Sequence, residues 1–244
     1  YIMDYGDVDA LFIGKIETWD DIKNDLPSEM PIIRFPKYEG CSNVTKGHEW
    51  HEFINSHEPI ENPNKPKLSD LWTIIFTSGT TGNPKGVMLT YQAIDGIKVV
   101  LDDPNNPLGI KHTGNNDFIS YLPLNHIFER VVIEWCSFRY GGTISFVESI
   151  ETFGQNLKEV QPHVFAAAPR VWTKLQMGIL SKFPQKKLDT LLKIPLLSTI
   201  LKKLIRKGLG FSRVRVTVSG SAPMPVELIE WFRKVGVYLS LIHI

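Results

Sequence analysis

The feature that most constrains the fold is an alternation of strand-like and helix-length segments after residue 68. The strand-like runs are short and rich in β-branched and aromatic residues. A chain ordered as strand, helix, strand predicts an α/β layered domain with a largely parallel sheet. The expected strands are 72–76, 118–122, 143–147, 163–167 and 214–218, and the expected helices are 91–101, 128–139, 151–160, 170–181 and 226–235.

The first 67 residues lack this alternation and predict a separate, partial subdomain. Two short runs, 10–13 and 31–35, are candidate strands, and the proline-containing stretch 58–66 predicts a linker. We therefore expect a partial N-terminal subdomain with its linker over 1–67 and an incomplete α/β subdomain over 68–239. The tail 240–244 is similar to translated sequencing-adaptor read-through, so we expect it to be non-native and the chain to be cut at both ends.

Composition places few limits on function but favours one kind of compartment. The chain is 43% hydrophobic and 22% charged, as in ordinary soluble globular proteins. Its two cysteines, Cys41 and Cys136, form no CxxC pair and indicate neither a disulfide framework nor a zinc site. No signal peptide is visible, and no apolar run approaches the roughly 18 residues of a membrane span. We expect a cytoplasmic protein, or one on the cytoplasmic face of a membrane.

Charge is concentrated in one segment although the net charge is only +1. Between Lys182 and Arg215 there are ten Lys or Arg residues and one acid, Asp189. Leucines and isoleucines between the lysines give an amphipathic segment, interrupted by Pro195. Two interpretations stay open: peripheral contact with an anionic membrane, or helices packed on the domain with solvated lysines. Nucleic-acid binding is not indicated, because the segment contains no recognition motif.

The loop TSGTTGNPKG, residues 77–86, places three glycines, four hydroxyl side chains and one lysine within ten residues. Glycines let the backbone approach a ligand closely, hydroxyls donate hydrogen bonds, and lysine supplies positive charge. These properties together predict a site for a chain of phosphates. The loop follows an expected strand, where α/β sheets place their ligands.

Several familiar sites are excluded by the same residues. The loop is not a GxxxxGK[ST] phosphate loop, because Pro84 precedes Lys85 and Gly86 follows it. No dinucleotide GxGxxG is present, and neither Ser78 nor Ser221 lies in a GxSxG nucleophile elbow. The histidines at 48, 51 and 57 do not form HExxH and predict no metal site.

Four motifs, in order along residues 69 to about 239, resemble those of one enzyme superfamily. They are TSGTTGNPKG at 77–86, YLPLNHIFER at 121–130, APRVWTK at 168–174 and SGSAPM at 219–224. This set resembles the AMP-forming acyl-adenylating enzymes, and the second and third motifs resemble their long-chain acyl-CoA synthetase branch. Asn125 departs from the usual alanine of the second motif.

The resemblance implies ATP-dependent activation of a long-chain fatty acid to acyl-AMP, followed by thioester formation with CoA. ATP, Mg²⁺ and CoA as co-substrate are implied with it, whereas oligomeric state and chain-length preference are not. The alternatives are a medium-chain or aryl acyl-CoA ligase, or a nucleotide-binding module without catalysis. The family's later motifs, including its magnesium-binding glutamate and catalytic lysine, are absent, so we expect this piece alone to be inactive.

The resemblance also implies roles for particular residues. His126 is implied to lie near the carboxylate and the α-phosphate as a catalytic donor. Trp172 is implied to gate the acyl tunnel, although a plain core tryptophan remains the alternative. The first motif is implied to bind phosphates and the fourth to bind adenine. The implied nucleotide-binding residues are Thr77, Ser78, Gly79, Thr80, Thr81, Gly82, Lys85, Gly86, Gly220, Ser221, Ala222 and Pro223.

Overall fold

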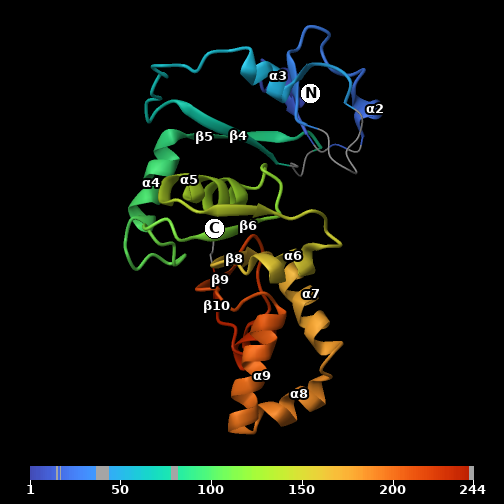
Figure 1. Ribbon diagram of the computed structural model, residues 1–244, viewed down its shortest axis with the longest axis vertical. Helices are drawn as coiled ribbons and strands as arrows, with labels where there is room; N and C mark the ends of the chain where they lie inside the picture. Colours follow the sequence, from blue (N-terminus) through green and yellow to red (C-terminus); the bar gives the residue numbers. More distant parts are fainter. Residues whose placement is uncertain (15, 17, 37–43, 78–81, 242–244) are drawn as a thin grey trace. The chain divides into compact units, whose positions relative to one another are not determined.

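The computed structural model describes residues 1–14, 16, 18–36, 44–77 and 82–241. The chain forms two compact units, Tyr1–Tyr91 and Gln92–Ile244 (Figure 1). This division keeps residues 68–91 with the N-terminal part, whereas the sequence suggested a boundary at residue 67. The domain boundaries inferred from the sequence, and the non-native character of 240–244, stay predictions.

The first unit contains a small parallel sheet in the order β1-β2-β3. Leu11 pairs with Ile32, and Ile33 pairs with His48. One face of this sheet packs on a cluster formed by Ile13, Trp19, Ile32 and Val44. The two strands expected here are confirmed with slightly shorter bounds. The elements are α1 (Ile2–Tyr5), β1 (Leu11–Ile13), α2 (Trp19–Ile22), β2 (Ile32–Arg34), β3 (His48–Glu49) and α3 (Trp50–Asn55).

The first unit also contains a hairpin of two antiparallel strands, β4 (Leu71–Thr77) and β5 (Lys85–Thr90). The expected strand 72–76 is confirmed as β4. The loop at 77–86 does follow a strand, but its placement at the end of a parallel strand is wrong, because β4 pairs antiparallel with β5. Strand β5 was missed because its short run Val87–Met88–Leu89 directly follows the glycine-rich loop.

The second unit is built on parallel strands, as the sequence predicted. Strands β6 and β7 pair in parallel, and a second parallel sheet has the order β10-β9-β8. The N–H of His163 donates to the carbonyl oxygen of Asp117 at 2.9 Å, so the start of β8 lies beside β6. The strands are β6 (Asp117–Ser120), β7 (Thr143–Phe146), β8 (Val164–Ala167), β9 (Val216–Ser219) and β10 (Leu239–Leu241).

All five helices expected in the second unit are present. Their ends follow local chemistry: Pro169 is the first residue of α7, and Gly141, with φ +70°, ends α5. The segment expected as one helix at 128–139 begins with a π-helical turn, η1. The helices are α4 (Tyr91–Leu101), η1 (Glu129–Trp135), α5 (Cys136–Tyr140), α6 (Phe153–Val160), α7 (Pro169–Leu180), α8 (Gln185–Leu192), α9 (Pro195–Gly208) and α10 (Val226–Lys234).

The basic segment 182–215 folds largely as helices α8 and α9. Pro195, which interrupts the sequence pattern, is the first residue of α9, where its missing N–H has no cost. In Figure 1 these two helices and α7 extend away from strands β8, β9 and β10 of the same unit. Within the described part of the chain, every helix is too short or too polar to cross a bilayer.

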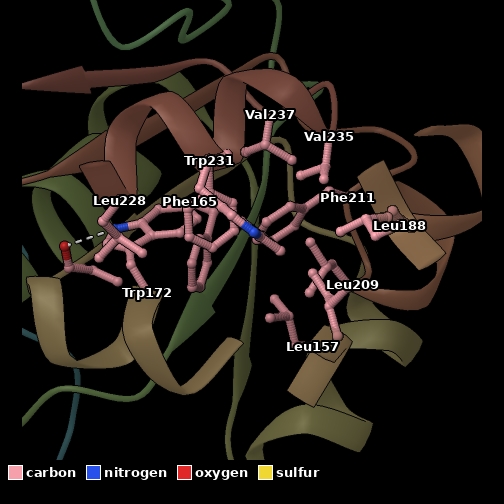
Figure 2. Packing of buried hydrophobic residues seen from close by; sticks show 14 of the residues in the cluster. Leu157, Phe165, Trp172, Leu188, Leu209, Phe211, Leu228, Trp231, Val235 and Val237 are labelled. Carbon is pink, nitrogen blue, oxygen red and sulfur yellow. Dashed lines mark hydrogen bonds between the residues drawn. The ribbon is translucent and has the colours of Figure 1, made fainter. Parts of the chain in front are cut away.

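The core of the second unit is an aromatic cluster between its helices and strands β8 and β9. Trp172 and Phe165 pack edge to face with centroids 5.3 Å apart, and Phe211 and Phe232 contact the same indole (Figure 2). Because this cluster joins α7, α10 and β8, it fixes where the ends of the strands lie.

Candidate functional site

The glycine-rich loop is held at its base by the β4–β5 hairpin. Thr77, the last residue of β4, pairs with Lys85, the first residue of β5, and its hydroxyl donates to the carbonyl oxygen of Lys85 at 3.5 Å. The Lys85 side chain is exposed and available to a ligand. Ser78, Gly79, Thr80 and Thr81 lie outside the described residues, so their roles stay predictions.

Two positions of the loop, 82 and 86, require glycine for different structural reasons. Gly82 has φ +97°, a backbone conformation that side chains disfavour. Gly86 lies in β5, where an added Cβ would come within 2.9 Å of Ile74 Cγ2 and 3.4 Å of the Phe76 ring. Gly86 therefore lets the two strands and their side chains pack closely beside the loop.

In the second unit, the second and fourth motifs meet at the carboxyl ends of β6, β8 and β9. His126 Nε2 lies 3.4 Å from Ser221 Oγ, although 95 residues separate them in sequence. Tyr121 donates a hydrogen bond of 2.7 Å to the carbonyl oxygen of Ala166, which ties the second motif to β8. The carboxyl ends of parallel strands are where open α/β sheets bind ligands.

A pocket of about 40 Å³ lies at this meeting point. Its walls are mainly small or apolar, so a flat group could approach the backbone at the strand ends. Gly220 and Ser221 line it, whereas Ala222 and Pro223 do not and are exposed. The lining residues are Leu122, His126, Phe128, Ala166, Ala167, Ala168, Val218, Gly220 and Ser221.

Local hydrogen bonding sets the tautomer of His126. The backbone N–H of Phe128 lies 3.2 Å from His126 Nδ1 and donates to it. A neutral imidazole that accepts at Nδ1 carries its proton on Nε2. The Nε2–H therefore points toward Ser221 and the pocket, where it can donate to a negatively charged group.

Ser221 itself has an unusual backbone. Its φ is +67°, in the left-handed region that residues other than glycine seldom occupy. Such strain is found preferentially at functional sites, because the surrounding structure must hold it in place. The turn after β9 thus presents the Ser221 hydroxyl and the Gly220 backbone at the pocket.

Sequence reasoning missed Glu129, which directly follows the pocket residue Phe128. Its side chain is 1% exposed, and neither carboxylate oxygen has a hydrogen-bond partner among the described residues. Burial raises the pKa of this carboxyl, and the nearby Ser120 hydroxyl and Leu122 N–H only partly oppose that rise. The sequence feature that could have identified Glu129 is an acidic residue two positions before the apolar run Val131–Val132–Ile133.

Trp172 is a core residue in this structure. Its side chain is fully buried, and its indole N–H donates to the carbonyl oxygen of Ala167 at 3.1 Å (Figure 2). The acceptor belongs to a residue that lines the pocket, so Trp172 supports the pocket wall from behind. Its gating role stays a prediction.

The described residues offer no protein site for a metal ion. Among them, no three His, Cys, Asp or Glu side chains gather closely enough to hold a cation. The structure therefore assigns no ligand among these residues to the Mg²⁺ that the resemblance implies.

Parallel strands with a His–Ser pocket at their carboxyl ends define an α/β protein with a candidate small-molecule site. Comparison with known proteins gives the family: the model for the AMP-binding enzyme family matches residues 1–243. The chain belongs to the AMP-binding enzymes. Its resemblance to the long-chain acyl-CoA synthetase branch is also confirmed by its relatives.

Several relatives of this chain are named as long-chain acyl-CoA synthetases or long-chain fatty-acid–CoA ligases. Long chain acyl-CoA synthetase 5 of Arabidopsis thaliana is 33% identical over 217 residues, 78% of this chain and 32% of that protein. Long-chain-fatty-acid–CoA ligase 5 of Mus musculus is 33% identical over 194 residues, 72% of this chain and 28% of that protein. The chain thus spans about a third of the length of these relatives.

Solved structures confirm the fold. The adenylation domain of a carboxylate reductase from Mycobacterium chelonae matches with a TM-score of 0.74 at 17% identity, over 99% of this chain and 40% of that chain. The anthranilate CoA ligase AuaEII, solved with anthranoyl-AMP, matches with a TM-score of 0.69 at 17% identity, over 99% of this chain and 42% of that chain.

Proposed function

We propose that the full-length protein joins a long-chain fatty acid to AMP at the expense of ATP and then transfers the acyl group to CoA. The observation that carries this proposal is the pairing of His126 with Ser221 at the pocket, 3.4 Å apart. It brings together the two motifs to which the resemblance assigns the carboxylate and the adenine. The names of the relatives support the long-chain substrate class.

The chemistry requires a carboxylate oxygen to attack the α-phosphate of ATP with loss of pyrophosphate. The Nε2–H of His126 donates toward the pocket and can stabilise the negative charge that develops there. Gly220 and Ser221 carry no large side chain that would block the approach of a flat base. The resemblance assigns the leaving phosphates to the loop that precedes Gly86, where the exposed Lys85 supplies positive charge.

ATP and the acid are the first substrates, and CoA is the second. Mg²⁺, when bound, neutralises phosphate charge. The residues of this chain contribute orientation and hydrogen-bond donors, while the catalytic lysine of the resemblance is expected elsewhere in the full protein.

The test is fatty-acid-dependent exchange of pyrophosphate into ATP by the full-length protein. His126→Ala should lower the exchange rate about 10²–10³-fold, as expected for loss of one preorganised donor. His57→Ala, at an exposed histidine of the first unit, is the matched control and should leave the rate unchanged. If His126→Ala exchanges pyrophosphate at the wild-type rate, the proposed role of His126 is contradicted. If the wild-type protein shows no exchange, a non-catalytic nucleotide-binding module is favoured.

The acyl chain length needs its own measurement. The alternatives are a medium-chain or an aryl acid, and the neighbour solved with anthranoyl-AMP belongs to an anthranilate ligase. Exchange rates with a series of saturated carboxylates and one aryl carboxylate decide between them. A maximum at medium chain length or with the aryl acid contradicts the long-chain assignment.

We also propose that α8 and α9 contact an anionic membrane, which would place the protein on the cytoplasmic face of that membrane. Leu196, Ile200 and Leu204 are spaced by four residues on α9 and are 74%, 49% and 56% exposed. Lys203 and Lys207 of the same helix are exposed as well. An apolar stripe beside lysines is typical of helices that lie in the interface of anionic bilayers.

Co-sedimentation with phosphatidylserine vesicles tests this contact, with phosphatidylcholine vesicles as the neutral reference. The double variant Leu196→Glu, Ile200→Glu should lose vesicle binding. Val99→Glu, at a 75% exposed valine of α4, should bind as the wild type does. Equal binding by all three proteins, or binding to neither vesicle, shows that α9 is not a membrane-contact surface.

A further inference from the structure

A small pocket lies in the second unit at the amino-terminal ends of β9 and β10, at the end of β9 opposite to Ser221. Its volume is about 70 Å³, which exceeds the roughly 10–15 Å³ that one water molecule needs. It is far below the roughly 300–1,000 Å³ of organic-ligand sites. The pocket shares no lining residue with the His126–Ser221 pocket. A ligand that fits it is therefore a small ion and not a nucleotide or an acyl chain.

Two arginines line this pocket, Arg206 of α9 and Arg215 just before β9, and no acidic side chain lines it. Within the described residues, neither guanidinium forms an ion pair with a carboxylate. Arg206 Nη2 donates to the carbonyl oxygens of Phe211 and Val214 at 3.2 and 3.3 Å. Arg215 Nη2 donates to Asn116 Oδ1 at 2.7 Å. These acceptors are neutral, so both positive charges are left without a paired carboxylate.

The charge of Arg215 is also poorly solvated. Its Nε and Nη1 are shielded from solvent and donate to no acceptor among the described residues. Burial lowers the pKa of this guanidinium, and the charge of Asp117 only partly opposes that effect. Asp117 is itself paired with Arg213, whose Nη2 lies 2.8 Å from its Oδ2. A shielded positive charge of this kind is costly, and an anion in the adjoining pocket would stabilise it.

The backbone around the pocket does not compete with such an anion. The carbonyl oxygens of Phe211 and Val214 accept from Arg206, and that of Tyr238 accepts from Thr217 Oγ1 at 2.6 Å. The planar N–H donors of a guanidinium match the oxygens of phosphate and carboxylate groups. The pocket therefore has the size and the charge for a single small oxyanion.

We propose that this pocket binds inorganic phosphate at Arg206 and Arg215. A free ion is favoured over the phosphate of a lipid headgroup because of the position of Arg206 on α9. Arg206 lies six residues beyond Ile200, about 120° around the helix from the centre of the apolar stripe of Leu196, Ile200 and Leu204. A membrane that contacts the stripe would thus not face the pocket. Bound phosphate would join α9 to the start of β9.

The first experiment is equilibrium dialysis of radiolabelled phosphate against the full-length protein, with ionic strength held constant by sodium chloride. Arg206→Gln should remove one equivalent of bound phosphate. Arg233→Gln, at an exposed arginine of α10 outside the lining, is the matched control and should bind as the wild type does. Lys85→Gln should retain the Arg206-dependent equivalent, which separates it from phosphate at the glycine-rich loop. Equal stoichiometry in wild type and Arg206→Gln overturns the proposal.

The second experiment uses thermal unfolding, because a ligand of the folded state raises the unfolding midpoint in a saturable way. Phosphate should raise the midpoint of the wild type at constant ionic strength. Arg206→Lys keeps the charge without the planar donors and should need about tenfold more phosphate for the same rise. A rise that chloride reproduces, or one that is identical in Arg206→Lys, overturns the site.

Vesicles that contain phosphatidic acid test the other source of a phosphate group. They should leave the Arg206-dependent binding of labelled phosphate unchanged. If they displace it, and Arg206→Gln abolishes that competition, the ligand is a lipid headgroup and the assignment to free phosphate is wrong.

The result can be distinguished from that for the proposed function. Arg206→Gln should retain fatty-acid-dependent pyrophosphate exchange, because Arg206 lines no part of the His126–Ser221 pocket. Loss of one phosphate equivalent with exchange at the wild-type rate supports the pocket. If Arg206→Gln loses both, the variant is misfolded and the tenfold effect of Arg206→Lys decides. A wild type that binds the Arg206-dependent phosphate without exchange supports the pocket and contradicts the ligase.

Discussion

Ser221 Oγ lies 3.4 Å from His126 Nε2, and the serine holds this position with a φ of +67°. The hydrogen-bonded side chain and the strained backbone belong to the same residue. Substitutions at this one position can therefore separate the two contributions.

Ser221→Gly and Ser221→Ala both remove the hydroxyl, but only glycine relieves the left-handed backbone. The glycine variant should be more stable than the alanine variant by about 1 kcal/mol. Urea denaturation of both proteins measures the difference. Equal midpoints would show that the turn after β9 relaxes in solution to a conformation that alanine adopts without strain.

Gly86→Ala should destabilise the β4–β5 hairpin although alanine is normally better than glycine in a strand. The added methyl group would come within 2.9 Å of Ile74 Cγ2, and such overpacking costs about 1–3 kcal/mol. Thermal unfolding measures the loss. The double variant Gly86→Ala, Ile74→Ala removes the clashing methyl group and should be less destabilised than the sum of its single variants. Strict additivity argues against the contact.

Trp172→Phe distinguishes a core tryptophan from a gate. Loss of the bond to Ala167 and of ring volume should lower the free energy of unfolding by about 1–3 kcal/mol. The gating role predicts in addition a changed chain-length profile in acyl activation. Trp231→Phe is the control, since Trp231 lies in the same cluster and bonds to Gln185. Matching profiles for both variants contradict the gate.

Glu129 makes stability depend on pH in the less common direction. Because burial raises the pKa of this carboxyl above its ordinary 4.5, the folded chain binds the proton more tightly than the unfolded chain. Its favourable contribution is complete below pH 4.5 and is lost as pH rises toward the folded pKa.

Glu129→Gln removes this titration and keeps the shape of the side chain. The difference in unfolding free energy between variant and wild type should grow in favour of the variant as pH rises above about 4.5, by roughly 1.4 kcal/mol for each unit of pKa elevation. Denaturation at several pH values measures it. A difference that stays constant with pH would mean that Glu129 is ionised in the folded protein.

The alternation of segments predicted most of the second unit because both its periodicity and its stop signals are local. Helix α4 was predicted with its observed bounds, and Gly141–Gly142 correctly marked the end of α5. The π-helical turn at Glu129–Trp135 was not predictable, since nothing in its residues distinguishes it from an α-helix. Helices α8 and α9 were not given bounds from the sequence, where Pro195 was interpreted only as an interruption of the amphipathic segment.

The candidate site was predictable only in part. Motif resemblance selected His126 and Ser221, but their approach depends on strands β6 and β9 that lie far apart in sequence. The antiparallel pairing of β4 with β5 depends on contacts across the loop and not on the loop residues.

The pairing of Thr77 with Lys85 has a thermodynamic consequence for the loop between them. Joining the ends of a loop restricts the chain, and in this protein the β4–β5 ladder imposes that restriction during folding. The phosphates that the sequence predicts for this loop would therefore meet ends, Thr77 and Lys85, that are already joined. A ligand that binds there need not supply the free energy of joining these ends, and such preorganisation favours affinity.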